Sequence, residues 1–231
     1  MGKRNKKNVI ATLLASKARI LTHLKQVIRD RDFSYRTFGT DVEDYLIDEV
    51  IKILKKKRVI KNETDFHKSH NKNEFPDLKI LQPQFLALEV KSGNHSRKKG
   101  SKWMSCKNSN NDMGTLNSWQ SKIKKFGGEN IYYIFIEYDF NLTKKIIDVK
   151  IAPFFEFLAL NKDGMLRYRE KDGNLRPKDF NKQSTVKSFI QFQKLFSKTE
   201  VYRSSRIIKK HLNKLPRKVA KKILHEMLAS F

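Results

Sequence analysis

The chain of 231 residues has one cysteine, few acidic side chains and no long apolar run. The single thiol, Cys106, excludes an intrachain disulfide and a zinc cluster built from several thiolates, and it suits a reducing compartment. No apolar run approaches the roughly 20 residues that a membrane span needs. We therefore expect a cytoplasmic protein without membrane association, in which any metal ion is held mainly by oxygen atoms.

The acidic side chains are outnumbered by basic ones, and the formal net charge is +26. Such self-repulsion is rarely tolerated unless a polyanion neutralises it. The excess lies in the first 30 residues, in the segment 95–114 and in the C-terminal tail. One lysine run alone could be a solvated helix face, and a membrane surface or an acidic protein is the alternative partner. The three zones together favour nucleic acid and association with the nucleoid.

The apolar pattern predicts helices that flank a mixed sheet, an α/β (α+β) fold with one core. The hydrophobic content of 39% is enough for that core. Expected helices and strands alternate as α, β, β, α, β, β, α. Their ranges are a helix over 8–30, a helix from 40 or 41 to about 57, strands near 77–81 and 85–91, a helix from about 115, strands within 129–140 and 144–154, and basic helices towards the end.

Two acids and a lysine interrupt the predicted hairpin around Pro83. The period of two in a strand puts Glu89 and Lys91 on one face, opposite the apolar residues between them. A tight turn would place Asp77 directly across from Glu89. Two facing carboxylates repel one another unless a cation lies between them, so the pattern favours a hard divalent ion such as Mg²⁺. Lys91 could then help to deprotonate a metal-bound water or stabilise charge on a phosphate.

Glu43 is unusual in the second predicted helix, because it lies near the centre of the apolar face. A glutamate in the first turn of a helix can also be explained by the helix dipole alone. The functional interpretation is an acid beside Asp77 that serves as an outer metal ligand or holds a metal-bound water.

Pro76-Asp77, eleven intervening residues and then Glu89-Val90-Lys91 resemble the PD-(D/E)xK nuclease core. Size and layout are most similar to the type II restriction endonucleases, over residues 40–150. The resemblance implies that Asp77, Glu89 and the Val90 carbonyl hold the metal and that Lys91 and Glu43 complete the catalytic set. A third D/E-x-K triplet, Asp148 to Lys150, is expected to form surface ion pairs.

The resemblance also implies a restriction-endonuclease-like sheet with basic helical extensions. It implies Mg²⁺-dependent cleavage of double-stranded DNA, with Mn²⁺ as a substitute, 5′-phosphate ends, a homodimer and no small-molecule cofactor. A basic helical segment (1–35), a catalytic core (40–150) and a mostly helical region for DNA binding or dimerisation (151–231) would share this work. A structure-selective or repair nuclease, and a basic DNA-binding protein without catalysis, are the alternatives.

The long polar segment after the predicted catalytic strand is a candidate DNA-binding loop. Its lysines suit phosphates and its asparagines can hydrogen-bond base edges. Two methionines look exposed there, and such a side chain could wedge between base steps, although packing against the domain is the alternative. These candidates are Lys98, Lys99, Lys102, Asn108, Asn110, Asn111, Met104 and Met113.

Overall fold

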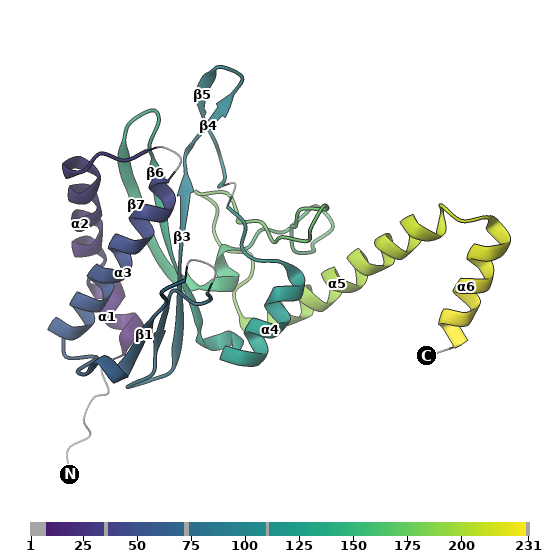
Figure 1. Cartoon of the computed structure of the whole chain (residues 1–231), viewed down its shortest axis with the longest axis horizontal. Helices are drawn as coiled ribbons and strands as arrows, with labels where there is room; N and C mark the ends of the chain where they lie inside the picture. The colour runs from purple at the N-terminus through teal and green to yellow at the C-terminus, as the bar shows by residue number, and fades with distance from the viewer. Residues whose placement is uncertain (1–7, 35–36, 72–73, 110, 230–231) are drawn as a thin grey trace, which may run out of the picture.

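A computed structural model of the chain describes residues 8–34, 37–71, 74–109 and 111–229 (Figure 1). Five strands form one sheet in the order β1-β2-β3-β6-β7, in which only β3 and β6 are parallel neighbours. A separate hairpin, β4–β5, extends beyond the end of β3 (Figure 1). The strands are β1 (Phe66–Lys68), β2 (Leu78–Ile80), β3 (Leu86–Asn94), β4 (Ser96–Lys99), β5 (Lys102–Ser105), β6 (Ile131–Asp139) and β7 (Lys145–Pro153).

Helices lie on both sides of this sheet, as the sequence pattern predicts. The α-helices are α1 (Val9–Ala15), α2 (Lys17–Asp30), α3 (Phe38–Lys56), α4 (Leu116–Phe126), α5 (Phe189–Leu212) and α6 (Arg217–Ala229). The short 3-10 helices are η1 (Glu63–Asp65), η2 (Gly128–Asn130) and η3 (Phe154–Phe157). None of the described helices is long and apolar enough to cross a membrane.

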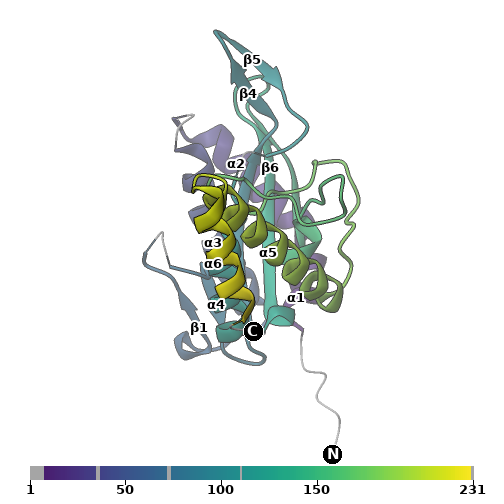
Figure 2. The same cartoon turned by 90° about the vertical axis from the view of Figure 1, so that its right-hand side faces the viewer.

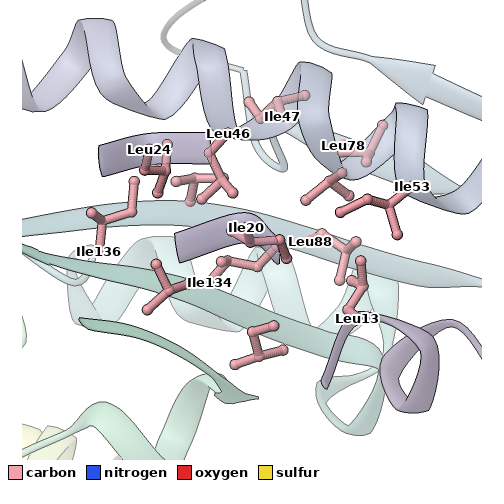
Figure 3. Packing of buried hydrophobic residues seen from close by; sticks show 14 of the residues in the cluster. Leu13, Ile20, Leu24, Leu46, Ile47, Ile53, Leu78, Leu88, Ile134 and Ile136 are labelled. Atoms are coloured by element: carbon pink, nitrogen blue, oxygen red, sulfur yellow. The ribbon is translucent and has the colours of Figure 1, made fainter. Parts of the chain in front are cut away.

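One face of the sheet packs against α1, α2 and α3 in an aliphatic core (Figure 3). Leu88 of β3 and Ile134 and Ile136 of β6 meet Leu46 and Leu24 of the helices there. The side chains alternate along β3, so the residues between these apolar ones must face the other side. Because the aliphatic side chains of β3 are buried on this face of the sheet, the polar side chains of β3 lie on the opposite face.

The opposite face carries a second core that is mainly aromatic. Trp119 of α4 stacks on Phe154 of η3, with 4.0 Å between the ring centroids. Tyr133 of β6 belongs to the same cluster. Phe192 and Phe196 join the first turns of α5 to it. Because α4 is the crossover between the parallel strands β3 and β6, it covers the face on which Glu89 and Lys91 lie.

Several local features differ from the sequence expectation. The first predicted helix is divided at Ser16 into α1 and α2, whose buried residues belong to the aliphatic core, so this segment is built into the domain. The helix α3 begins at Phe38, earlier than expected, after Thr37. Strands β1, β4 and β5 fall in stretches that look like loops in the sequence. Beyond η3 the chain is irregular up to Ser188, and only α5 and α6 make the last region helical.

Candidate active site

The hairpin β2–β3 has the register that the sequence predicts, and this register brings Asp77 next to Glu89. Leu78 pairs with Leu88, and Asp77 immediately precedes β2. The Oδ2 atom of Asp77 accepts a hydrogen bond from the Val90 N–H, 2.7 Å away. The Asp77 carboxylate is therefore fixed against β3 at the residue that follows Glu89.

Glu89 and Lys91 form an ion pair on the same face of β3. Their Oε1 and Nζ atoms are 2.6 Å apart. Glu89 is only 6% exposed, and its second oxygen, Oε2, is buried without a hydrogen-bond partner. A buried carboxylate oxygen with no donor is costly, because it has lost its water and gained nothing in return. This oxygen is therefore an open acceptor within the site.

Three carboxylates, those of Asp77, Glu89 and Glu43, lie close together and outnumber the lysines of this site. Burial and then the charge of Glu89 raise the pKa of Asp77 to about 7. Burial also raises the pKa of Glu43 to about 7, although Lys91 and the Ser92 hydroxyl act in the opposite direction. The electrostatic coupling with Lys91, Glu89 and Asp77 places Glu43 at the site, as its position on the helix predicts.

The pKa of the Lys91 ammonium reflects the same excess of acid. Its burial acts to lower the pKa, but Glu89, Glu43 and Asp77 outweigh that effect, so the pKa is raised. Lys91 is thus held in its charged form between acids, where it can donate hydrogen bonds. A cation bound by the carboxylates would weaken this hold on the proton.

A second lysine of the site, Lys122 on α4, was not predicted from the sequence. Its Nζ atom lies over the ring of Phe75, 3.9 Å from the centroid, and 5.0 Å from that of Trp119. Burial and the charge of Lys91 lower its pKa, while Glu89 and Asp77 act in the opposite direction. In the sequence, Lys122 looks like any lysine of a solvated helix face. The one sequence feature that could have indicated a cation here is the aromatic Phe75 just before Pro76, against which Lys122 packs.

Tyr133 is a further buried polar group beside Glu89. The two residues are cross-strand partners in the parallel pair β3–β6. The Tyr133 hydroxyl is buried without a hydrogen-bond partner, and burial followed by Glu89 raises its pKa well above the usual value. Two unsatisfied oxygens, one on each strand, therefore lie in the same part of the sheet.

The donor atoms of the site suit a hard divalent cation. Asp77 and Glu89 supply oxygens, one of which has no partner, and hard cations prefer oxygen ligands. In the described ranges no group of three or more His, Cys, Asp and Glu side chains is placed to hold a metal ion. These side chains alone would therefore leave a metal ion short of ligands.

Glu137 and Lys150 form a second acid–lysine pair further along the sheet. Lys150 donates to Oε1 of Glu137, and it also donates to the Phe180 carbonyl at 2.8 Å. The other oxygen of Glu137 lies 3.3 Å from Nε2 of His95, whose ring stacks on Phe180. The sequence did not predict Glu137 as a partner of Lys150. Because of this partner, Lys150 forms a partly buried ion pair instead of the expected surface pair. Asp148 does form a surface pair, with Lys17 at 2.8 Å.

The expected DNA-binding loop contains the hairpin β4–β5, which carries exposed cations. Lys98 pairs with Trp103 and Lys99 with Lys102 across the two strands. All three lysines are exposed, and Met104 is 50% exposed, in agreement with the sequence prediction. A cavity of about 400 Å³ lies between this hairpin and the body of the protein. Its lining includes Asn94, Arg97, Lys98, Trp103, Asn108 and Asn111.

The remaining loop candidates behave differently from one another. Met113 is fully buried in the aromatic core, so its expected exposure to DNA is wrong. The Asn108 amide donates to Asp179 at 3.4 Å, and the Asn111 amide donates to the Ser92 carbonyl. Both asparagines thus have protein partners, which also tie the loop to the body. Asn110 lies outside the described residues.

Comparison with known proteins gives a similarity at the level of the fold. No family model and no curated protein matches the chain. Among the solved structures that match is one titled NlaIV restriction endonuclease, with a TM-score of 0.51 and 18% sequence identity. The match covers 74% of this chain and 67% of that chain. The protein therefore has a restriction-endonuclease-like fold, a mixed sheet flanked by helices.

Proposed function

We propose that the protein is a PD-(D/E)xK nuclease of type II restriction class, which hydrolyses double-stranded DNA at specific sites with Mg²⁺. The observation that carries the proposal is the arrangement of Asp77, Glu89 and Lys91 at one end of the hairpin. Two carboxylates are held together there although they repel each other, and one oxygen lacks any partner. The fold shared with a restriction endonuclease supports DNA as the substrate.

Asp77, Glu89 and the Val90 carbonyl would hold the metal ion. The Val90 N–H points to Asp77. Because the N–H and C=O of one residue in an extended strand point to the same side, the Val90 carbonyl also faces this edge. When bound, Mg²⁺ would supply Lewis acidity at the scissile phosphate and lower the pKa of an attacking water. Mn²⁺, with similar oxygen preference, would substitute.

Lys91 would orient the attacking water and take part in its deprotonation. Its ion pair with Glu89 holds the ammonium beside the metal ligands. Glu43, whose raised pKa keeps it partly protonated near neutral pH, would hold water at the outer edge of the site. Lys122 would add a positive charge against the phosphate, from the opposite side to Glu43, since α4 and α3 cover different faces of the sheet.

The hairpin β4–β5 would meet the DNA next to the cleavage site, since it continues directly from β3. Lys98, Lys99 and Lys102 would contact phosphates, and Met104 would contact a base step. Asn108 and Asn111 line the cavity beneath the hairpin and could reach base edges only by exchanging their present partners. A homodimer would place two such sites on the two strands.

The test is cleavage of intact phage DNA at low protein concentration, with Mg²⁺ or with EDTA. The matched variants are Lys91→Ala and Lys150→Ala, which remove a lysine from each of the two acid–lysine pairs. Discrete fragments that require Mg²⁺, persist in Lys150→Ala and disappear in Lys91→Ala are expected. A smear or only nicked products would point to a structure-selective or repair nuclease. Bound but uncut DNA under every divalent metal would refute catalysis.

A further inference from the structure

The C-terminal helices form an arm that leaves the domain from its catalytic side. Phe192 and Phe196 place the root of α5 in the aromatic core, and Thr199 is fully buried as well. Figure 2 views the molecule from the side of the arm, with α5 and α6 in front of the sheet. This core covers the face of the sheet that carries Glu89 and Lys91. In Figure 1 the rest of α5 runs away from the sheet, and α6 turns back at its far end.

The last contacts between the arm and the body come from the middle and the second half of α5, and Arg206 lies six residues before its end. Gln120 donates to Glu200 at 2.8 Å, and Arg206 pairs with Glu170 at 2.6 Å. Between residues 207 and 226, the hydrogen bonds and ion pairs that the described residues show join arm residues to each other. Leu212 ends α5 thirteen residues after the buried Thr199, so the end of α5 stands about 20 Å further out along the helix.

The outer part of the arm, residues 209–222, is strongly basic, and we call it the basic elbow. It contains seven Lys and Arg residues and no Asp or Glu. Among these cations in the described structure, only Lys222 has an acidic neighbour, Glu226 at 3.9 Å. The basic residues are Lys209, Lys210, Lys214, Arg217, Lys218, Lys221 and Lys222, and all are exposed.

The turn between the two helices is held by backbone hydrogen bonds. Lys214 N–H donates to the His211 carbonyl at 3.1 Å, and Leu215 N–H donates to the Leu212 carbonyl at 3.0 Å. The Ala220 N–H closes the first turn of α6 onto the Pro216 carbonyl at 3.0 Å. The elbow therefore presents its cations from a defined backbone. The N-terminal end of α6, with its partial positive charge, lies among them.

We propose that the basic elbow binds the phosphate backbone of duplex DNA outside the segment that occupies the cleavage site, an inference that rests on DNA being the substrate. The six residues of α5 after Arg206 extend about 9 Å beyond the last contact with the body, which corresponds to some three base pairs at roughly 3.4 Å each. Contacts to phosphate from lysines carry no base sequence. The elbow thus increases affinity for DNA of any sequence and leaves site choice to the body.

Charge decides between DNA and a second copy of the arm as the partner. Exposed apolar side chains, such as Ile208 at 37%, Leu215 at 40% and Val219 at 45%, lie between the lysines. A second arm could cover these side chains, but it would bring seven more cations against the first seven. Like charges placed together cost free energy, whereas a polyanion releases its counterions on contact.

The experiment compares two triple variants with the same change in charge. Lys210→Gln, Lys214→Gln and Lys218→Gln alter the elbow, while Lys52→Gln, Lys56→Gln and Lys57→Gln alter exposed lysines at the C-terminal end of α3, on the opposite side of the sheet. Binding to a 30-base-pair duplex is measured by fluorescence anisotropy in EDTA over a range of salt concentrations.

We expect the elbow triple variant to bind more weakly, with the slope of log affinity against log salt smaller by about 2 to 3. The control triple variant should change the slope by less than about 1. A slope for the elbow variant equal to that of the wild type overturns the proposal. So does binding to vesicles of anionic phospholipid in preference to the duplex. Sedimentation that shows loss of a dimer without a change in slope would assign the arm to a second copy instead.

Failure of the nuclease function is separable from failure of this proposal. Binding in EDTA does not depend on cleavage, and Lys91→Ala should keep the salt slope of the wild type. If the wild type cuts no DNA but the elbow variant has a smaller salt slope than the wild type, catalysis is refuted and DNA binding by the elbow is supported. If the elbow variant cuts and binds like the wild type, the elbow is refuted and catalysis stands.

Discussion

Two acid–lysine pairs lie on the same sheet, and they differ in what remains unsatisfied. In the pair of Glu137 and Lys150, both carboxylate oxygens have partners, and the lysine also donates to the Phe180 carbonyl. In the pair of Glu89 and Lys91, one oxygen has no partner, and a second carboxylate, Asp77, is held nearby. The first pair therefore has all its acceptors satisfied, whereas the second leaves one buried acceptor open, and in this sense the site of Glu89 and Lys91 is incomplete. Residue types alone do not distinguish them.

The lysines of the two pairs should therefore differ most in cleavage. Replacing Lys91 by Ala removes the group that acts on the attacking water, and the cleavage rate should fall on the order of 10²–10³-fold. Replacing Lys150 by Ala should leave the rate per folded molecule within roughly threefold, because this lysine contacts no proposed metal ligand. Single-turnover cleavage at saturating DNA measures both. Equal losses in the two variants would contradict the assignment of the site.

The free energy of unfolding should depend on the ion pair of Glu137 and Lys150. Lys150→Met leaves Glu137, whose side chain is 5% exposed, with only His95 as a partner. Leaving a buried charge without its counterion should lower the free energy of unfolding by about 3 kcal/mol. Urea denaturation followed by circular dichroism measures the change, and Lys17→Met, which breaks an exposed pair with Asp148, is the control and should cost at most about 1 kcal/mol.

Lys122 tests whether the incomplete site extends to α4. Lys122→Met keeps an unbranched side chain against Phe75 and Trp119 but removes the charge. Cleavage should slow roughly tenfold, less than for Lys91, because Lys122 contributes only electrostatic stabilisation of the phosphate. Lys125→Met, on the same helix and over the Phe126 ring, is the matched control. An unchanged rate for Lys122→Met would remove this lysine from the site.

Local pattern predicted the part of the site that depends on neighbouring strands. The period of two and the turn around Pro83 were enough to place Asp77 opposite Glu89, and the helical period was enough to turn Glu43 inward. Both conclusions concern residues whose relation is set by one hairpin or one helix. Neither conclusion needs information on how distant segments of the chain pack.

The rest of the site depends on how distant segments meet. Lys122 enters because the crossover helix lies over β3, and nothing in its own sequence separates it from Lys125. Glu137 sits in a strand that is otherwise apolar, and its partners come from residues 95, 150 and 180. The Met113 side chain packs in the aromatic core, and its N–H donates to the carbonyl of Leu175, which lies in an irregular segment far along the chain and belongs to the same core. Polar sequence neighbours therefore gave the wrong prediction for this side chain.

The smallest expected effect concerns the charge of the incomplete site when no metal is bound. The pKa of Asp77 and that of Glu43 are both raised to about 7 in the folded protein. Between the ordinary pKa of a carboxyl and 7, the folded protein holds protons that the unfolded chain has released. The metal-free protein should thus gain stability as the pH falls through 7 and lose it as the pH rises. Lys91 remains charged throughout this range and does not reverse the trend.

Thermal unfolding at pH 6 and pH 8 in EDTA measures this trend. The wild type should unfold a few degrees higher at pH 6, after subtraction of the same difference for Asp77→Asn, which cannot titrate at that position. Mg²⁺ should raise the unfolding temperature of the wild type more at pH 8 than at pH 6, because protons compete with the cation for the same oxygens. If Asp77→Asn shows the same dependence on pH and Mg²⁺ as the wild type, then Asp77 does not hold the metal. The complete pair of Glu137 and Lys150 would give no such response, since Lys150→Ala should keep the Mg²⁺ effect at both pH values.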